Sequence, residues 1–228
     1  MNIIVDFNTL FRGRLAERPD VKIDAVHFKG DFAALANGKR PRVAVIGTRD
    51  PSPYGLETTR RIIEALSRNP QKPLVLSGLA LGIDTAAHRA ALEHGLGTVA
   101  VLPTGLDTVY PYRNTGLAET IMETKDCCLV TQFPEQTAPM PMNFLIRNTT
   151  LALLSDLVIV VESKEKGGAM VAARLAWDAG IPVLAVPGRI DDVRSAGCNA
   201  LINLGQAKML FNPEWLEAMQ IDIENEKF

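Results

Sequence analysis

Small and basic residues follow several apolar runs of this chain. Ser77 and Gly78 end the run at 74–78, and "GTR" at 47–49 and "KGG" at 166–168 follow two others. Main-chain N–H groups in a glycine turn at the start of a helix bind phosphate without a charged side chain. Arginine adds a planar fork that holds phosphate oxygens or stacks on a base. The pattern therefore predicts an anion-binding pocket built from turns and guanidinium groups.

Asp84 and His88 lie four residues apart, so they face the same side of the helix expected after Gly82. Such a pair could do acid–base chemistry, with the carboxylate fixing the imidazole tautomer. No nucleophile accompanies them, and we predict no catalytic residue. We expect Asp84 to support the helix start and His88 to pack locally, with direct contact to a ligand as the alternative.

Composition limits the class of protein. The 228 residues are 47% hydrophobic and carry a net charge of −2, which fits one main core and leaves only a local patch for a polyanion. The three cysteines and three histidines lack metal-ligand spacing, and Cys127 and Cys128 are neighbours, so we predict neither a metal site nor a disulfide. With no membrane span and no apolar leader, we expect a cytoplasmic protein.

Apolar runs alternate with helical patterns from residue 41 onward. The runs occupy 43–47, 74–78, 98–102, 128–131, 157–162 and 182–186. The helical patterns occupy 52–69, 82–95, 114–125, 142–156 and 167–180, followed by a helix near 196–204, a short strand near 208–211 and a last helix. Continuous apolar runs are typical of strands covered on both faces. We predict an α/β fold: a doubly wound, mainly parallel sheet with helices on both faces, a Rossmann-like three-layer sandwich.

Two regions are expected along the chain. Residues 1–40 are more polar and less regular, and we interpret them as an N-terminal extension that packs on the edge of the sheet or contacts a partner. Residues 41–228 form the core, with a short helical C-terminal end. The core carries neither the dinucleotide fingerprint nor the Walker phosphate loop, which argues against a nicotinamide dehydrogenase and a P-loop NTPase.

Several motifs together resemble the DprA/Smf family, the DNA-processing proteins of bacterial transformation. They are "VAVIGTR…YG" (43–55), "LSGLALGIDTAAHRAAL" (76–92), "TVAVLPTGLDTVYP…N" (98–114), "FLIRN" (144–148), "LVIVVES" (157–163), "AVPG" (185–188) and "SAGCNALINLGQA" (195–207). The resemblance implies a Rossmann-like core that binds single-stranded DNA, forms a homodimer and helps load the recombinase RecA. It implies no cofactor and no established catalytic reaction.

The resemblance also implies the ligand-binding residues. They are Gly47, Thr48, Arg49, Ser77, Gly78, Leu79, Ala80, Gly105, Tyr110, Arg113, Asn114, Arg147, Asn148, Gly167 and Gly168. Tyr110 could stack on a base, although a loop tyrosine that caps the core is an equal alternative. Asp84 and His88 are expected to support the site.

This chain departs from the family at several places, one of them Thr131-Gln132, where the family often has Ser-Glu. Thr149 stands where a second arginine is usual, and "GGAMVAA" (167–173) replaces a turn richer in hydroxyl groups. The loss of donors would also suit a sensor of small nucleotides. A third alternative is a nucleotide phosphoribohydrolase with the motif P-G-G-x-G-T-x-x-E, but Val171 and Arg174 stand where its Thr and catalytic Glu belong.

Overall fold

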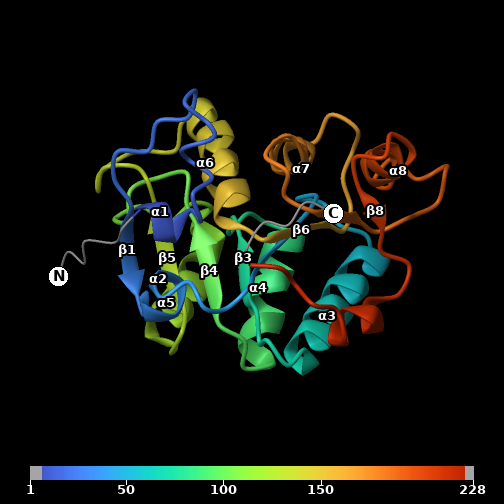
Figure 1. Cartoon of the computed structure of the whole chain (residues 1–228), viewed down its shortest axis with the longest axis horizontal. Helices are drawn as coiled ribbons and strands as arrows, with labels where there is room; N and C mark the ends of the chain where they lie inside the picture. Colours follow the sequence, from blue (N-terminus) through green and yellow to red (C-terminus); the bar gives the residue numbers. More distant parts are fainter. Residues whose placement is uncertain (1–6, 224–228) are drawn as a thin grey trace.

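The computed structural model describes residues 7–223 as an α/β sandwich (Figure 1). Its strands are β1 (His27–Gly30), β2 (Arg42–Ile46), β3 (Leu74–Ser77), β4 (Thr98–Val101), β5 (Cys128–Thr131), β6 (Leu157–Val160), β7 (Val183–Ala185) and β8 (Lys208–Met209). Its α-helices are α1 (Phe7–Leu10), α2 (Ala33–Ala36), α3 (Pro53–Arg68), α4 (Ile83–Glu93), α5 (Thr115–Glu123), α6 (Pro141–Leu154), α7 (Gly168–Asp178) and α8 (Ala196–Asn203). The 3₁₀ turns η1 (Tyr112–Asn114) and η2 (Pro213–Glu217) complete the set.

The strands form one sheet in the order β1-β5-β4-β3-β2-β6-β7-β8. All neighbouring strands run parallel except β1, which pairs antiparallel with β5. From β2 the chain proceeds outward through β3 and β4 to β5, then returns through α6 to place β6 on the other side of β2. The strand order therefore reverses between β2 and β6, which confirms the predicted doubly wound, mainly parallel fold.

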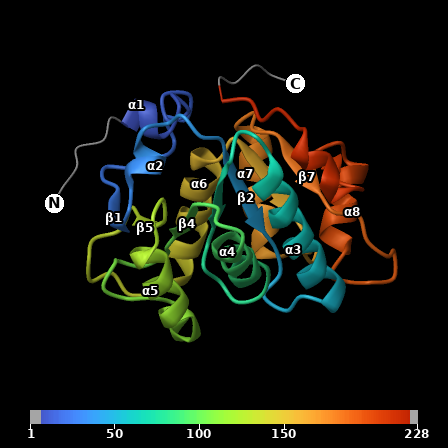
Figure 2. The same cartoon turned by 90° about the horizontal axis from the view of Figure 1, so that it is seen from below.

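Helices cover both faces of the sheet, and alternate strand residues point to each face. Ala44 and Ile46 of β2 pack in the core under α6, α7 and α8, whereas Val43 and Val45 pack against α3 and α4. A smaller cluster joins α5 to β4 and β5. Figure 2 shows α3, α4 and α5 on the face seen from below. Burial on both faces explains why the strand sequences are continuously apolar.

Capping residues fix the boundaries of the longest described helix. Pro53 begins α3 at a position where a missing N–H costs nothing, and the Ser52 hydroxyl accepts a hydrogen bond from the Gly55 N–H at 3.1 Å. The helix ends at Arg68, before extended Asn69. At 16 residues α3 is too short and too polar for a membrane span, and no other helix between residues 7 and 223 qualifies.

The described part of the N-terminal segment packs on the same core. β1 lies at the edge of the sheet, with His27 opposite Thr131 of β5. Leu10, Phe11 and Leu35 are fully or almost fully buried together with residues of α6. The expected division of the chain at residue 40 stays a prediction, but the segment supplies both an edge strand and core side chains.

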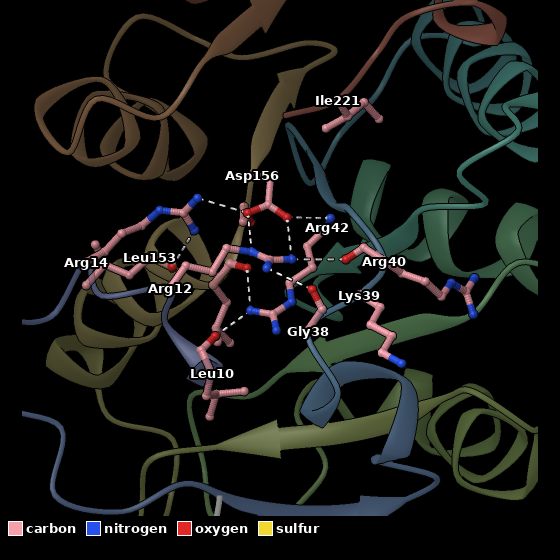
Figure 3. Close-up of polar contacts among 12 residues, drawn as sticks. Leu10, Arg12, Arg14, Gly38, Lys39, Arg40, Arg42, Leu153, Asp156 and Ile221 are labelled. Carbon is pink, nitrogen blue, oxygen red and sulfur yellow. Dashed lines mark hydrogen bonds and ion pairs between the residues drawn. The ribbon is translucent and has the colours of Figure 1, made fainter. Parts of the chain in front are cut away.

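A buried ion cluster connects this segment to the start of β2 and the end of α6 (Figure 3). The Asp156 carboxylate lies 2.7 Å from Arg12 Nε and 2.9 Å from Arg14 Nη2, and it accepts the Arg42 backbone N–H at 2.9 Å. The side chain of Asp156 is fully buried. One carboxylate therefore compensates several guanidinium groups that are excluded from water.

Helix carbonyls compensate the rest of this positive charge. The Arg42 guanidinium donates to the carbonyl oxygens of Leu10 and Leu35, at the C-terminal ends of α1 and α2. Burial lowers the pKa of Arg42 to about 9, and the neighbouring Arg12 adds to this shift. The guanidinium nevertheless stays charged near neutral pH, and the negative end of a helix is a favourable place for it.

Candidate functional site

A cavity of about 510 Å³ lies at the carboxyl ends of the strands, at the switch point between β2 and β6. We call it the switch-point cavity. Its polar and turn residues are Gly47, Thr48, Arg49, Asp50, Ala80, Asp84, Arg147, Asn148, Ser163, Lys164, Lys166, Gly167 and Gly168, and Phe144 and Leu145 of α6 add apolar surface. A side cavity of about 60 Å³ shares Arg49, Phe144 and Arg147 with it and adds Gly78 and Tyr110.

Cations without carboxylate partners surround the switch-point cavity. Arg49 is exposed after β2, and its guanidinium carbon lies 5.3 Å from the centre of the Phe144 ring. Lys164 and Lys166 are exposed in the loop after β6. Among residues 7–223 none of the three forms an ion pair, whereas Asp50 is paired with Arg194 at 3.2 Å. The cavity thus has an excess of positive charge although the chain is weakly acidic.

Arg147 forms the floor shared by both cavities and is only 5% exposed. Its Nη1 donates to the Val101 carbonyl at 3.3 Å, and its Nε is buried without a hydrogen-bond partner in the described structure. Burial lowers the pKa of Arg147, while the nearby Asp84 carboxylate opposes the shift. A Cβ on Gly78 would lie 1.2 Å from Nη1. Residue 78 is therefore glycine because the guanidinium occupies the space of a side chain.

The turn after β3 differs from the expectation. The Gly78 and Ala80 N–H groups, expected to be open to a phosphate, donate to Asp84 Oδ2 at 3.1 and 3.4 Å. The Ser77 hydroxyl is buried and donates to the Val45 carbonyl at 2.7 Å. The protein's own carboxylate thus occupies the anion position of this turn, so Ser77 and these two amides are committed to hydrogen bonds within the protein.

A second internal carboxylate occupies the N-terminus of α3. Buried Glu162 accepts hydrogen bonds from the backbone N–H and the hydroxyl of Ser52, and a Cβ on Gly55 would lie 2.3 Å from Glu162 Oε2. By contrast, Gly168 opens α7 at the cavity, and a Cβ there would meet no atom within 4 Å. In the first turn of α7 the Met170 N–H donates to the Gly167 carbonyl at 3.1 Å. The Gly168 and Ala169 N–H groups have no partner within the helix, so these two are the open amides of the site.

His88 is buried and lines neither cavity. Its Nδ1 lies 2.8 Å from Thr98 Oγ1, whose hydroxyl donates to the Val75 carbonyl. Because the hydroxyl proton is committed, Nδ1 carries the ring proton and donates. Full burial lowers the pKa of His88 to about 3. Asp84 likewise makes the turn-supporting contacts, in addition to lining the cavity.

Five of the expected ligand residues line neither cavity: Ser77, Leu79, Gly105, Arg113 and Asn114. Leu79 is buried, and its carbonyl accepts a hydrogen bond from Asn114 Nδ2 at 2.8 Å. Gly105 approaches the backbone of Glu135, which its missing side chain allows. Arg113 is exposed on η1, outside the cavities. The structure therefore brings Arg49 and Arg147 together at the cavities, whereas Arg113, expected to bind the same ligand, lies outside both.

The remaining predicted residues, Gly47, Thr48, Asn148 and Gly167, line the switch-point cavity with Arg49. Sequence reasoning missed Phe144 and the individual lysines Lys164 and Lys166. A signal for Phe144 was present, because residues three apart on a helix share a face and Phe144 precedes Arg147 by three. The lysines lie in a loop that follows a predicted strand, where ligand-binding side chains are expected.

The doubly wound sheet defines a Rossmann-like α/β protein, and its switch-point cavity is cationic and lined by glycines. The family model of DNA recombination-mediator protein A matches residues 14–219, and the chain belongs to this family. The resemblance to DprA/Smf proteins is thereby confirmed.

Curated relatives cover most of this chain. It is 38% identical to DNA processing protein DprA of Streptococcus pneumoniae over 178 residues, which are 78% of this chain and 60% of the relative. It is 34% identical to DprA of Bacillus subtilis over 82% of this chain and 60% of the relative. The chain thus spans about three fifths of the length of these two relatives.

Solved structures agree with this assignment. The X-ray structure of S. pneumoniae DprA superposes with a TM-score of 0.75 at 37% identity, covering 83% of this chain and 64% of that one. DprA of Helicobacter pylori, described for its single-stranded DNA binding mode, superposes with a TM-score of 0.80 at 28% identity. The superposition covers 95% of this chain and 92% of that one.

Proposed function

We propose that this chain binds single-stranded DNA at the switch-point cavity and acts as a recombination mediator in DNA processing and uptake. The observation that carries the proposal is the pairing of Arg49 with Phe144 at the cavity. An exposed guanidinium without a carboxylate partner offers charge to a phosphate, and the ring beneath it offers a face to a base. Stacked aromatic residues beside a cationic track are how proteins hold single strands without reading their sequence.

The positive charge and the open amides of the site support single-stranded DNA as the ligand. Lys164, Lys166 and Arg49 supply the sequence-independent attraction to phosphates that a chain with a net charge of −2 cannot supply as a whole. The open amides of α7 add donors for one phosphate. The relative from H. pylori is described as binding single-stranded DNA, which is consistent with the same ligand here.

A phosphoribohydrolase would need a free carboxylate, and the described lining of the switch-point cavity offers none. Asp50 is paired with Arg194, and Asp84 is bound to the turn amides. Arg174, at the position of the phosphoribohydrolase glutamate, is exposed on α7 and does not line the cavity. The absence of catalysis stays a prediction. A small-nucleotide sensor keeps some support, because a volume of about 510 Å³ lies in the range of small-molecule sites.

We also propose a cytosolic homodimer that has RecA as a partner. β8 is the last strand of the sheet within residues 7–223, and exposed Leu204, Met209, Phe211 and Trp215 lie on or near it. A second copy of the chain would cover this apolar edge. Light scattering should give the mass of two chains, and Phe211→Asp should return the mass of one chain. A monomeric wild-type protein would contradict the dimer.

The test of DNA binding is fluorescence anisotropy with labelled oligo-dT, with a duplex and free mononucleotides as competitors. We expect the oligo-dT to bind at low salt and the duplex to compete poorly. Three neutralised phosphates at about −0.7 each give a slope of log affinity against log salt near −2. An oligo-dT that does not bind at low salt, while one mononucleotide strongly raises the melting temperature, would favour the sensor instead.

A further inference from the structure

Aromatic rings continue from the cavities toward the outside of the molecule. The Phe144 ring packs edge-on against Tyr110, with centroids 5.6 Å apart, and Tyr110 packs edge-on against Tyr112 at 6.4 Å. Phe144 lines both cavities and Tyr110 lines the side cavity, whereas Tyr112 lines neither. The three rings therefore form a connected path from the cavities to the surface, which we call the aromatic path.

Tyr112 ends this path with a bare ring, because its side chain is 72% exposed. Arg113, the next residue, is also exposed and forms no ion pair among residues 7–223. Tyr112 and Arg113 thus bring the same two residue types as Phe144 and Arg49, an aromatic ring and an unpaired guanidinium, as neighbours in the sequence and without the ring contact that Arg49 makes. The repeat has the composition of a stacking platform with a phosphate contact.

The backbone under Tyr112 is held firmly, although its side chain is exposed. Asn114, in the same 3₁₀ turn, is buried and donates from Nδ2 to the Leu79 carbonyl at 2.8 Å and to Thr85 Oγ1 at 2.9 Å. The Thr115 hydroxyl donates to the Tyr112 carbonyl at 2.8 Å. These contacts fix η1 to the turn after β3, so the ring of Tyr112 is presented with little loss of backbone freedom on binding.

We infer that the aromatic path is a second stacking subsite, and that the ligand is an extended single strand with one base on Tyr112 and a phosphate near Arg113. The inference rests on the proposed function and deepens it. A ligand confined to the switch-point cavity never reaches Tyr112, so the subsite distinguishes an oligonucleotide from a mononucleotide. The subsite also gives Arg113 a ligand contact, although Arg113 lies outside both cavities.

The experiment compares Tyr112→Ala, Tyr112→Phe and Arg113→Ala with wild type in anisotropy titrations of oligo-dT, with thymidine monophosphate as competitor. Trp177→Ala is the control, since Trp177 is a half-exposed aromatic residue at the far end of α7. Tyr112→Ala should weaken oligo-dT binding about 5- to 150-fold, the range of one lost stacking contact, and Tyr112→Phe should restore it. Tyr112→Ala should leave the inhibition constant of thymidine monophosphate unchanged, because the monophosphate does not reach Tyr112.

The salt dependence separates the two parts of the subsite. Arg113→Ala should make the slope of log affinity against log salt shallower by about 0.7, and Tyr112→Ala should leave the slope unchanged. Wild-type affinity of Tyr112→Ala for oligo-dT would overturn the inference. In that case a loss of oligo-dT binding by Arg49→Ala in the same assay would still support the proposed function. A lower molecular mass of Tyr112→Ala than of wild type in light scattering would also overturn the inference. It would show that the Tyr112 ring makes a contact between two copies of the chain.

Discussion

At the scale of single residues, the protein's own side chains explain several small residues of the site. Gly78 makes room for the buried Arg147 guanidinium, and Gly55 makes room for Glu162. Only Gly168 faces open space at the cavity. A glycine-rich βα turn is thus compatible with two opposite arrangements, one open to a ligand and one filled from within.

Gly78→Ala should destabilise the protein, because the added Cβ collides with Arg147 Nη1 and displaces the buried guanidinium from its hydrogen bond to the Val101 carbonyl. Overpacking of this kind costs about 1–3 kcal/mol. Gly168→Ala is the matched control and should leave the urea midpoint of unfolding unchanged or slightly raised, since alanine is the better helix former. Equal midpoints for the two variants would contradict the packing of Arg147 against Gly78.

His88 should make the folded state sensitive to acid. Its pKa is lowered to about 3 when folded, whereas the unfolded chain has the ordinary value near 6.5. The unfolded state therefore binds a proton first, and stability present above pH 6.5 is lost as the pH falls toward the folded value. At pH 5 the loss is about 2 kcal/mol.

The check is urea unfolding at pH 7 and pH 5 for wild type and His88→Asn, whose amide retains a donor for Thr98. The free energy of unfolding should fall less between the two pH values in the variant, by about 2 kcal/mol. An identical fall in both proteins would show that His88 does not carry this acid sensitivity.

Sequence reasoning placed the candidate residues at the strand ends where the cavity lies, but it could not say which amides were open. Arg49 and the turns at 47–49 and 167–168 follow strands, and that position alone places them at the cavity. Whether Asp84 reaches back to the amides of Gly78 and Ala80 depends on side-chain rotamers and on the exact start of α4. A residue pattern predicts neither the rotamers nor the exact start of the helix.

At the scale of elements, the long apolar runs were predictable and the N-terminal strand was not. All six predicted strands of the core appear within one or two residues of their expected limits, because each is buried on both faces. β1 reads "HFKG", is four residues long and is partly exposed, so its sequence carries no apolar run. Its place in the sheet comes from pairing with β5, a long-range contact.

Asp156 should be the most sensitive position of the Arg12–Arg14–Arg42 cluster. Removing one partner of a buried ion pair leaves uncompensated charge and costs about 3–5 kcal/mol. Asp156→Ala should therefore shift the urea midpoint strongly, and Asp156→Asn should shift it too, because the amide keeps the shape but not the charge.

The control for this prediction is Asp20→Ala, which breaks the exposed pair with Arg18. Its urea midpoint should match wild type, since solvent screens such pairs. An Asp156→Ala protein as stable as the control would show that the helix carbonyls alone compensate the arginines.

At the scale of the whole molecule, the fold separates stabilising charge from binding charge. The buried arginine cluster lies at the amino-terminal end of β2, and the switch-point cavity lies at the carboxyl-terminal end of the same strand. Arginines of the first are neutralised by Asp156 and helix carbonyls, whereas Arg49, Lys164 and Lys166 are left without carboxylates. A weakly acidic protein can therefore present a local cationic site.

The most direct test of the central claim is the affinity of Arg49→Ala for oligo-dT at low salt, measured against Arg60→Ala. Arg60 is equally a surface arginine, but it is paired with Glu57 and Glu64 on α3. We predict that Arg49→Ala loses most of the binding and about 0.7 of the salt slope, while Arg60→Ala binds like wild type. Binding that is unchanged by Arg49→Ala, or reduced equally by both variants, would contradict the account.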